Sequence, residues 1–215
     1  DWNEHVKSGL HKPSQATVQE INQAESNTNF IQLSKGELSK DLFPLETMKL
    51  VMGKVSDKME PFGYEDPKGF LLLREALTTY LKALGINASP SSILIVSGAL
   101  QALQLISVGL LQRGSTVLLE KPSYLYSLYV FQSAGMKLTG LPMDEQGLLS
   151  NTVFTSKKQQ GKVILYSIPS FHNPTGILMS EKRRQELLEV CEKEQLPMIE
   201  DDVYRELWID ETPPL

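Results

Sequence analysis

The pattern of apolar and polar residues changes character near residue 92. Beyond that point, short apolar runs rich in Val, Ile and Leu alternate with longer segments whose apolar residues recur at helical spacing. Strands are expected at residues 93–96, 116–120, 137–141, 163–168 and 198–200. Helices are expected at residues 99–111, 124–133, 149–159 and 181–195. Strands joined by helical crossovers favour an α/β fold with a mainly parallel sheet that is covered on both faces.

The segment before residue 92 carries a different pattern. Residues 1–30 are mostly polar, and Thr-Val-Gln-Glu at 17–20 has the spacing of a capping box. That spacing predicts a short helix, although a loosely packed lead-in fits the same residues. Residues 29–36 form an extended piece that ends in Gly36, and a helix is expected after it, running to about Ser56.

A second helix is expected to begin at Asp66 and Pro67, because an N-cap residue followed by proline is typical of a helix start. Its apolar residues recur at helical spacing, and Gly85 supplies the stop. They are Phe70, Leu73, Leu77, Leu81 and Leu84.

We divide the chain into three parts. They are a polar lead-in or linker (1–30), an N-terminal arm with helices (31–90) and the α/β domain (91–215).

Composition and charge narrow the function classes. The net charge of −5 and the isoelectric point near 5.3 argue against nucleic-acid binding by this segment itself. Residues 1–30 contain no apolar core of a signal peptide. The most apolar stretch, residues 93–111, is broken by Ser97 and Gly98. We therefore expect a cytoplasmic protein without membrane contact.

The single cysteine and the three histidines predict no metal site. Cys191 shares a helix face with Leu187 and Leu188, which favours a buried structural thiol over a nucleophile. The histidines show no metal-ligand spacing with each other or with Cys191: they are His5, His11 and His172. His172 lies beside Asn173 and could touch a ligand there, but a loop residue without a role in a site is the favoured interpretation.

Two motifs follow the fourth and fifth expected strands. The first is Asn-Pro-Thr-Gly, which begins at Asn173, and the second runs from Asp201 through Asp202 to Tyr204. In an open α/β sheet, ligands bind where strands end, so an amide, a carboxylate and a phenol are expected at one crevice. Pyridoxal 5'-phosphate requires hydrogen-bond donors near its phenolic oxygen and an anionic group near its ring nitrogen.

Each of these motifs has a simpler interpretation. Turn chemistry alone accounts for the first, and a solvated acidic loop accounts for the second. Successive side chains on an extended chain point to opposite sides, so only one of the two carboxylates need face the crevice. The solvated loop explains Asp202 well and Asp201 poorly.

Two earlier strand ends add to the pattern. Ser97 and Gly98 join a strand to a helix, and the first N–H groups and the positive dipole end of that helix could bind a phosphate. Many other strand–helix joints have the same features. Tyr124 follows the second strand, where its ring either stacks on a flat cofactor or packs half-buried.

Together and in this order, the motifs over residues 30–210 resemble fold-type-I pyridoxal-phosphate enzymes, the aspartate aminotransferase-like superfamily. The resemblance implies a three-layer large domain of the pyridoxal-phosphate-dependent transferase type. It also implies that Asn173 and Tyr204 bond the phenolate oxygen of the cofactor. Asp201 would meet the pyridine nitrogen, and Tyr124 would stack on the ring.

The same resemblance assigns four more positions. Ala99 and Leu100 would meet the phosphate, and Gly36 would line the pocket for the substrate carboxylate. Tyr64 would reach the phosphate of a neighbouring subunit, which implies a homodimer. Leu100 stands where relatives often place a polar residue, and this departure implies weaker phosphate binding.

A narrower resemblance rests on residues 30–44, Phe-Ile-Gln-Leu-Ser-Lys-Gly-Glu-Leu-Ser-Lys-Asp-Leu-Phe-Pro, which follow a polar linker containing Trp2. This segment is similar to the start of the aminotransferase-like domain of MocR-type regulators of the GntR family. In those proteins a winged-helix DNA-binding domain precedes the linker. The resemblance implies an effector-sensing domain for an amino acid or amine, with DNA bound only through a domain upstream of Asp1.

Two other functions stay open. One is a free-standing aminotransferase acting on an amino acid and a 2-oxo acid. A gene with roughly 80 to 120 residues upstream, encoding a helical DNA-binding domain, would favour the regulator instead. The other is a nucleotide-binding α/β module, although the Gly-x-Gly-x-x-Gly fingerprint is absent from the sequence.

The end of the chain limits what it is expected to do. In relatives, the Schiff-base lysine lies beyond the Asp-x-x-Tyr motif, and no lysine follows Tyr204 here. We therefore expect no catalytic residue, no imine at the native site and weak cofactor binding by this chain alone. In the family's sheet order, two later strands separate the first strand from the fifth. Residues 91–215 would thus be an incomplete domain, truncated before its last strands, and Leu215 is not expected to be the natural end. Either the polypeptide continues beyond it, or the gap is filled by rearrangement or by strands from another chain.

Overall fold

The computed structural model describes residues 1–6, 16–27, 29, 31, 33, 38–60, 63–159 and 161–215. Within them, four strands form the larger sheet in the order β2-β1-β5-β6. They are β1 (Thr116–Glu120), β2 (Lys137–Leu141), β5 (Val163–Ser167) and β6 (Met198–Glu200). Every neighbouring pair is parallel, which confirms the predicted α/β class with a parallel sheet.

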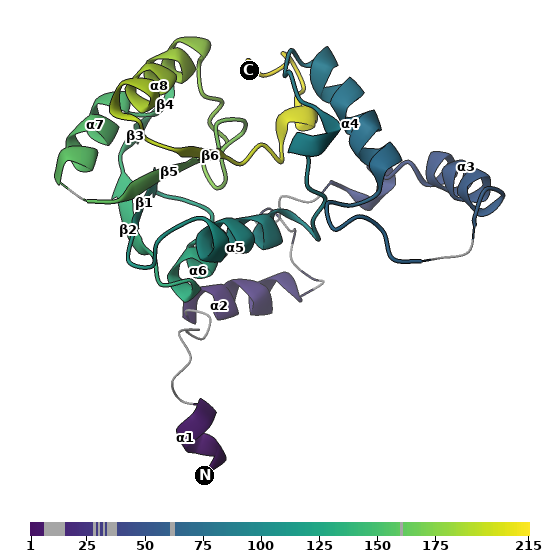
Figure 1. Cartoon of the computed structure of the whole chain (residues 1–215), viewed down its shortest axis with the longest axis horizontal. Helices are drawn as coiled ribbons and strands as arrows, with labels where there is room; N and C mark the ends of the chain where they lie inside the picture. The colour runs from purple at the N-terminus through teal and green to yellow at the C-terminus, as the bar shows by residue number, and fades with distance from the viewer. Residues whose placement is uncertain are drawn as a thin grey trace.

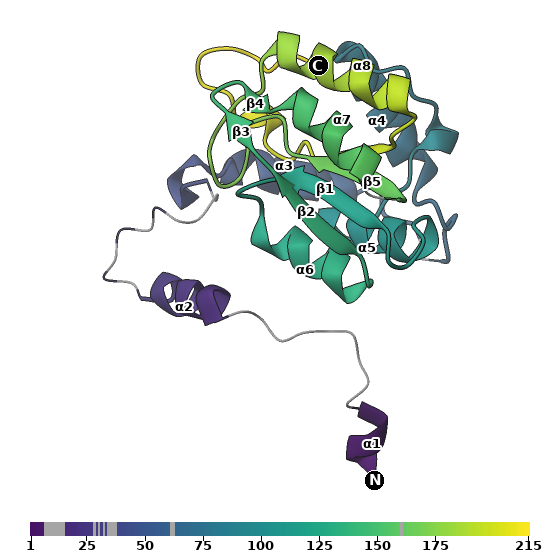
Figure 2. The same ribbon diagram turned by 90° about the vertical axis from the view of Figure 1, so that its left-hand side faces the viewer.

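Helices cover both faces of this sheet, giving three layers (Figure 2). On one face lie α5 (Ala99–Gly109) and α6 (Leu125–Ser133), and on the other α7 (Ser150–Gln159) and α8 (Glu181–Glu194). Residues along each strand alternate between the two sides, as the period of a strand requires. In β1, Val117 packs in the same cluster as Phe131 of α6, and the next residue, Leu118, packs with Leu187 of α8. Both faces are therefore buried, which accounts for the continuous apolar runs.

The predicted strand at residues 93–96 is wrong. These residues are extended, but in the described part of the chain they belong to neither sheet, and they do not pair with β6. The Ile95 N–H instead donates to the Lys68 carbonyl oxygen at 2.9 Å. An apolar extended run becomes a strand only where a neighbouring strand supplies its hydrogen bonds, and β6 remains an edge of the sheet.

The N-terminal part is helical. It contains α1 (Trp2–Val6), α2 (Ala16–Glu25), the 3-10 turn η1 (Lys40–Leu42), α3 (Leu45–Ser56), α4 (Leu71–Ala83) and the 3-10 turn η2 (Pro90–Ser92). Helix α2 begins one residue before Thr17, so the capping box does not mark its start. Gly36 and most of the segment around it lie outside the described residues.

The expected helix start at Asp66 is also wrong, because α4 begins at Leu71. Asp66 closes a turn instead, and its carboxylate accepts hydrogen bonds from Lys68 N at 2.7 Å and from Arg74 Nη2 at 3.2 Å. Gly69 then takes a φ of 99°, and a Cβ there would lie 2.6 Å from the Ile95 side chain. This glycine conformation interrupts the helical pattern read from the sequence.

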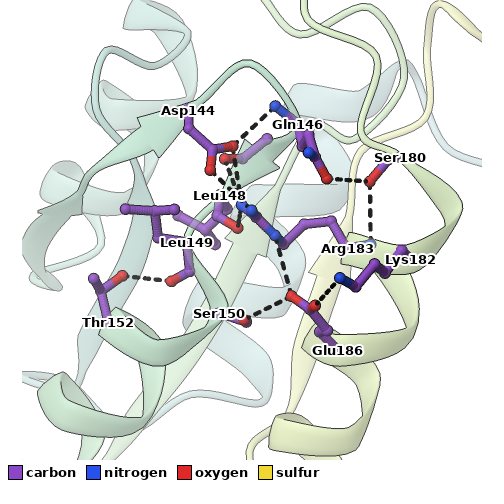
Figure 3. A network of polar contacts seen from close by, with 11 residues as sticks. Asp144, Gln146, Leu148, Leu149, Ser150, Thr152, Ser180, Lys182, Arg183 and Glu186 are labelled. Atoms are coloured by element: carbon purple, nitrogen blue, oxygen red, sulfur yellow. Dashed lines mark hydrogen bonds and ion pairs between the residues drawn. The ribbon is translucent and has the colours of Figure 1, made fainter.

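A short hairpin that the sequence did not predict lies between β2 and α7 in the chain and is bonded to α8. Strands β3 (Met143–Asp144) and β4 (Gly147–Leu148) pair in antiparallel fashion. Arg183 of α8 donates to the Asp144 carboxylate at 2.9 and 3.1 Å, and to the carbonyls of Gly147 and Leu148 at 3.1 and 2.8 Å (Figure 3). The guanidinium therefore fixes the hairpin against the helix.

The last residues return towards α4 (Figure 1). The 3-10 turn η3 (Arg205–Leu207) follows β6, and the Tyr80 hydroxyl of α4 donates to the Glu206 carboxylate. Helix α3 lies farther from the sheet and buries none of its residues. Among the described helices, none has both the length and the apolar character needed to cross a membrane.

Candidate cofactor site

A cavity of about 250 Å³ opens where β1, β5 and β6 end and α5 begins. Six residues singled out in the sequence line it together: Ala99, Leu100, Tyr124, Asn173, Asp201 and Tyr204. They come from four separate segments of the chain, which the parallel sheet brings to one edge. Ser97, Gly98, Ile168 and Val203 complete the lining.

Asp201 supplies the acidic group of the cavity. Its backbone N–H donates to the Ser167 carbonyl at 2.8 Å, which extends the pairing of β5 and β6 by one bond. Its carboxylate accepts the Tyr166 hydroxyl at 2.7 Å. Burial raises the pKa of Asp201, while the bond from Tyr166 acts in the opposite direction. The carboxylate is thus desolvated and held by one donor, ready to meet a cationic group.

Asp202 points elsewhere, as the alternation of side chains predicts. It does not line the cavity and pairs with Arg205, so it is not simply a solvated loop residue. Arg205 is buried and also donates to the carbonyl oxygens of Pro213 and Pro214. This carboxylate therefore serves the fold of the last residues and not the cavity.

Asn173 and Tyr204 form the second polar wall. The Asn173 Nδ2 donates to the Tyr204 hydroxyl at 3.1 Å. Because the tyrosine oxygen accepts this bond, its own O–H proton remains available to a group in the cavity. The loop that presents Asn173 is closed by backbone bonds from His172 N to the Ile177 carbonyl at 2.9 Å and from Gly176 N to the His172 carbonyl at 2.6 Å.

The remaining walls are an aromatic ring and a helix end. Tyr124 caps α6, and its ring centroid lies 5.5 Å from that of Tyr126. Helix α5 starts after Gly98, which has a φ of 95° and no side chain to satisfy the first N–H groups. The positive end of α5 therefore opens into the cavity at Ala99 and Leu100.

A larger cleft of about 870 Å³ adjoins the cavity and shares Tyr124, Asn173 and Tyr204 with it. One of its walls comes from α2, through Ile21, Asn22 and Glu25. The Asn22 side chain accepts the Tyr126 hydroxyl at 3.3 Å. The sequence did not assign α2 to the site, because nothing in a short polar helix shows which element it packs against.

The other expected site residues are not placed at these cavities. Tyr64 is fully exposed and lines neither of them, and Gly36 lies outside the described residues. Tyr166 was missed by the sequence reasoning, although a tyrosine inside an apolar strand has a hydroxyl that needs a partner once buried. Among the described residues lining the two cavities, none is lysine or arginine.

Comparisons with known proteins identify close relatives. A family model described as aminotransferase class I and II matches residues 28–213. A protein of Bacillus subtilis (strain 168) named "uncharacterized HTH-type transcriptional regulator YdfD" is 70% identical over the whole of this chain, which covers 44% of YdfD. The chain thus spans about half the length of this relative.

Two solved aminotransferases share the fold. The multiple substrate aminotransferase of Thermococcus profundus matches the whole chain at 27% identity with a TM-score of 0.88, over 55% of its own length. LysN, the alpha-aminoadipate aminotransferase of Thermus thermophilus, matches 99% of the chain at 29% identity with a TM-score of 0.82, over 53% of its own length. That LysN structure holds N-(5'-phosphopyridoxyl)-L-leucine.

Proposed function

The chain belongs to the aminotransferase class I and II family, and from this premise we propose that its cavity binds pyridoxal 5'-phosphate in the effector-sensing half of a transcriptional regulator. The observation that carries the proposal is the convergence of Asp201, the Asn173–Tyr204 pair and the open end of α5 on one cavity. These groups fit the cofactor at its ring nitrogen, its phenolic oxygen and its phosphate.

Each side chain has a defined task towards the cofactor. The Asp201 carboxylate favours a protonated ring nitrogen, because opposite charges at close range stabilise each other. Asn173 and the free proton of Tyr204 donate to the phenolic oxygen, and the ring of Tyr124 stacks on the pyridine. The first N–H groups of α5 receive the phosphate. When bound, pyridoxal phosphate supplies an aldehyde and an electron-withdrawing ring.

The regulatory role is supported by the similarity to YdfD, which is named an HTH-type transcriptional regulator. The ligand we assign to the adjoining cleft is an amino acid or amine, because the aldehyde of the cofactor reacts with amino groups. DNA would be bound through a part of the protein outside this acidic chain, and the protein would act as a homodimer.

Ligand titration of the intact protein tests the cofactor. Pyridoxal phosphate is expected to raise the melting temperature and to change the absorbance spectrum, whereas NAD is expected to do neither. Asp201→Asn and Tyr204→Phe are each expected to weaken binding by about tenfold, since each removes one charge-assisted or strong hydrogen bond. Asp210→Asn, on the exposed C-terminal segment, is the matched control. A response to NAD equal to that of pyridoxal phosphate would favour a nucleotide-binding module.

DNA binding separates the regulator from a free-standing aminotransferase. The intact protein is expected to retard a fragment of its own upstream DNA, and a panel of amino acids and amines is expected to change that retardation. Rapid transamination by an intact protein that does not retard the fragment would support the enzyme instead.

A further inference from the structure

Two buried ionisable side chains, one at the end of β1 and one in the loop that carries Asn173, are not used by the proposed function. Glu120, the last residue of β1, is 0% exposed, and His172 is 2% exposed. In the described part of the chain, His172 is the one ion-pair candidate for Glu120. Buried ionisable groups without a clear counter-charge are costly, so their protonation state needs an explanation.

The two oxygens of Glu120 differ in their surroundings. Oε1 accepts hydrogen bonds from the Ser167 hydroxyl and from the Ile168 N–H, the latter at 3.1 Å. Oε2 is buried without a partner and lies 4.0 Å from His172 Nε2, which is also buried without a partner. One oxygen is thus committed as an acceptor, and the other faces a ring nitrogen across a short gap.

His172 has its other ring nitrogen engaged. Nδ1 lies 2.8 Å from the Thr175 hydroxyl, whose oxygen also accepts a 3.3 Å bond from Ile177 N. With a proton on Nδ1 that donates to Thr175, Nε2 is left as an acceptor. Burial lowers the pKa of His172 to about 4, which keeps the ring neutral.

Burial and nearby negative charge both disfavour the ionised form of Glu120. Burial is the main cause that raises the pKa of this carboxyl, and the carboxylate of Asp201 adds to it. The other titratable groups around Glu120 are the Tyr166 hydroxyl of β5 and His172 of the loop. A protonated Glu120 therefore removes both the cost of a buried charge and the repulsion from Asp201.

We propose that Glu120 and His172 form a neutral buried pair, in which a proton held on Glu120 Oε2 faces the acceptor Nε2 of His172 across the 4.0 Å gap. The pair links the end of β1 and β5 to the inner side of the loop, because Glu120 already binds Ser167 and Ile168. Glu120 is then a positioning residue that holds Asn173 at the cavity through its sequence neighbour. Only this last link rests on the proposed function.

The dependence of stability on pH tests the pair without any cofactor. A carboxyl that holds its proton more tightly in the folded state stabilises the protein fully below the ordinary pKa of glutamate, and this contribution is lost as the pH rises through the folded pKa. Glu120→Gln keeps the shape, a donor and an acceptor, but cannot titrate. It is expected to flatten the fall in unfolding free energy as the pH rises above the ordinary pKa of glutamate.

Glu189→Gln, which removes an exposed carboxylate from α8, is the matched control and is expected to leave the slope unchanged. Urea unfolding of the intact protein at several pH values gives both slopes. An ion pair would have the opposite sign: Glu120→Gln would then lose stability at pH 7 relative to the control, because the charged histidine would be left alone. That result, or an unchanged slope, would overturn the proposal.

Nitrogen NMR of the His172 ring gives an independent reading. The neutral tautomer with its proton on Nδ1 is expected at pH 7 and should persist down to about pH 5, consistent with the lowered pKa. A doubly protonated ring at pH 7 would contradict the neutral pair.

The link to Asn173 is tested by the affinity for pyridoxal phosphate. Glu120→Gln is expected to keep the affinity within about twofold, and Glu120→Ala to weaken it by about tenfold. Combining Glu120→Ala with Asn173→Ala should add little beyond Asn173→Ala alone, because both changes act through one side chain. Full additivity would remove the positioning role. If no variant and no wild-type protein binds the cofactor, the proposed function fails while the pH slopes still report on the pair.

Discussion

At the scale of single residues, Asp201 depends on a tyrosine that is not itself part of the cavity. Tyr166 is fully buried in β5, and its ring meets Phe131 edge-to-face with centroids 5.2 Å apart. Burial raises the pKa of its hydroxyl, which therefore remains a donor to Asp201. The packing of one aromatic ring thus determines how the acidic group of the cavity is held.

Removing this hydroxyl gives a direct prediction. Tyr166→Phe keeps the ring but deletes the donor, so the pKa of Asp201 should rise further and its anionic form should be less available. Pyridoxal phosphate affinity is expected to fall about fivefold, the equivalent of roughly 1 kcal/mol for one hydrogen bond. Tyr80→Phe removes a hydroxyl bonded to the Glu206 carboxylate, away from the cavity, and serves as the control in the same titration. Equal losses in the two variants would contradict the role of Tyr166.

The residue types of the site could be read from the sequence, because the ends of parallel strands must meet. The environment of each residue could not be predicted from the sequence. Asp202 pairs with Arg205, which lies only three residues on, yet nothing in the sequence separates this pair from a solvated loop. His172 is buried and bonded to Thr175, an environment that its loop position in the sequence does not reveal. Burial depends on which segments pack together, and single-residue patterns do not contain that information.

At the scale of elements, Arg183 connects α8 to the β3–β4 hairpin. Only 11% of its side chain is exposed, and its donors satisfy the Asp144 carboxylate and two backbone carbonyls. Glu186, one turn further along α8, lies 3.3 Å from its Nε. Each hairpin strand is only two residues long and forms few hydrogen bonds of its own. The Arg183 guanidinium therefore contributes much of the stabilisation of the hairpin.

Arg183→Met is expected to lower the free energy of unfolding by about 2 kcal/mol, because it leaves buried carbonyl groups without a donor. Lys182→Met is the neighbouring control, since 84% of that side chain is exposed. Its effect is expected to stay within about 0.5 kcal/mol, as for most surface changes. Urea unfolding measures both, and similar losses in the two variants would show that the network contributes little.

Long periodic elements were predictable, and short or context-dependent ones were not. The helices that cover the sheet were expected within a few residues of their observed bounds, because their apolar faces repeat over several turns. The hairpin was missed because two-residue strands have no period to detect. The run at residues 93–96 has the composition of a strand but no neighbouring strand in the described structure, and strand formation is a property of pairs.

At the scale of the whole molecule, burial is concentrated around the sheet. Both core clusters contain strand residues and the helices that cover them, whereas α3 buries none of its residues. Several apolar side chains of α3 are exposed, among them Met48, Met52 and Val55. The stability of the 215-residue chain is therefore unevenly distributed.

Hydrogen exchange of this chain should reveal that distribution. Amides of β1 and β5 are expected to exchange slowest, because each of these strands lies between two other strands of the sheet. Amides of α3 are expected to exchange faster than those of α8, a helix of similar length that packs on the sheet. Slower exchange in α3 than in α8 would show that an unrecognised contact protects it.

The strand order also has a consequence for how the chain matures during synthesis. The ribosome completes β1 and β2 first, and their pairing leaves the other edge of β1 open until β5 has emerged. Glu120 then has no Ser167 to bind, and the later half of the cavity does not exist. Asp201 and Tyr204 emerge later still, after β6. The nascent domain therefore passes through a period in which one edge of β1 is unpaired, and an unpaired strand edge can pair with other chains.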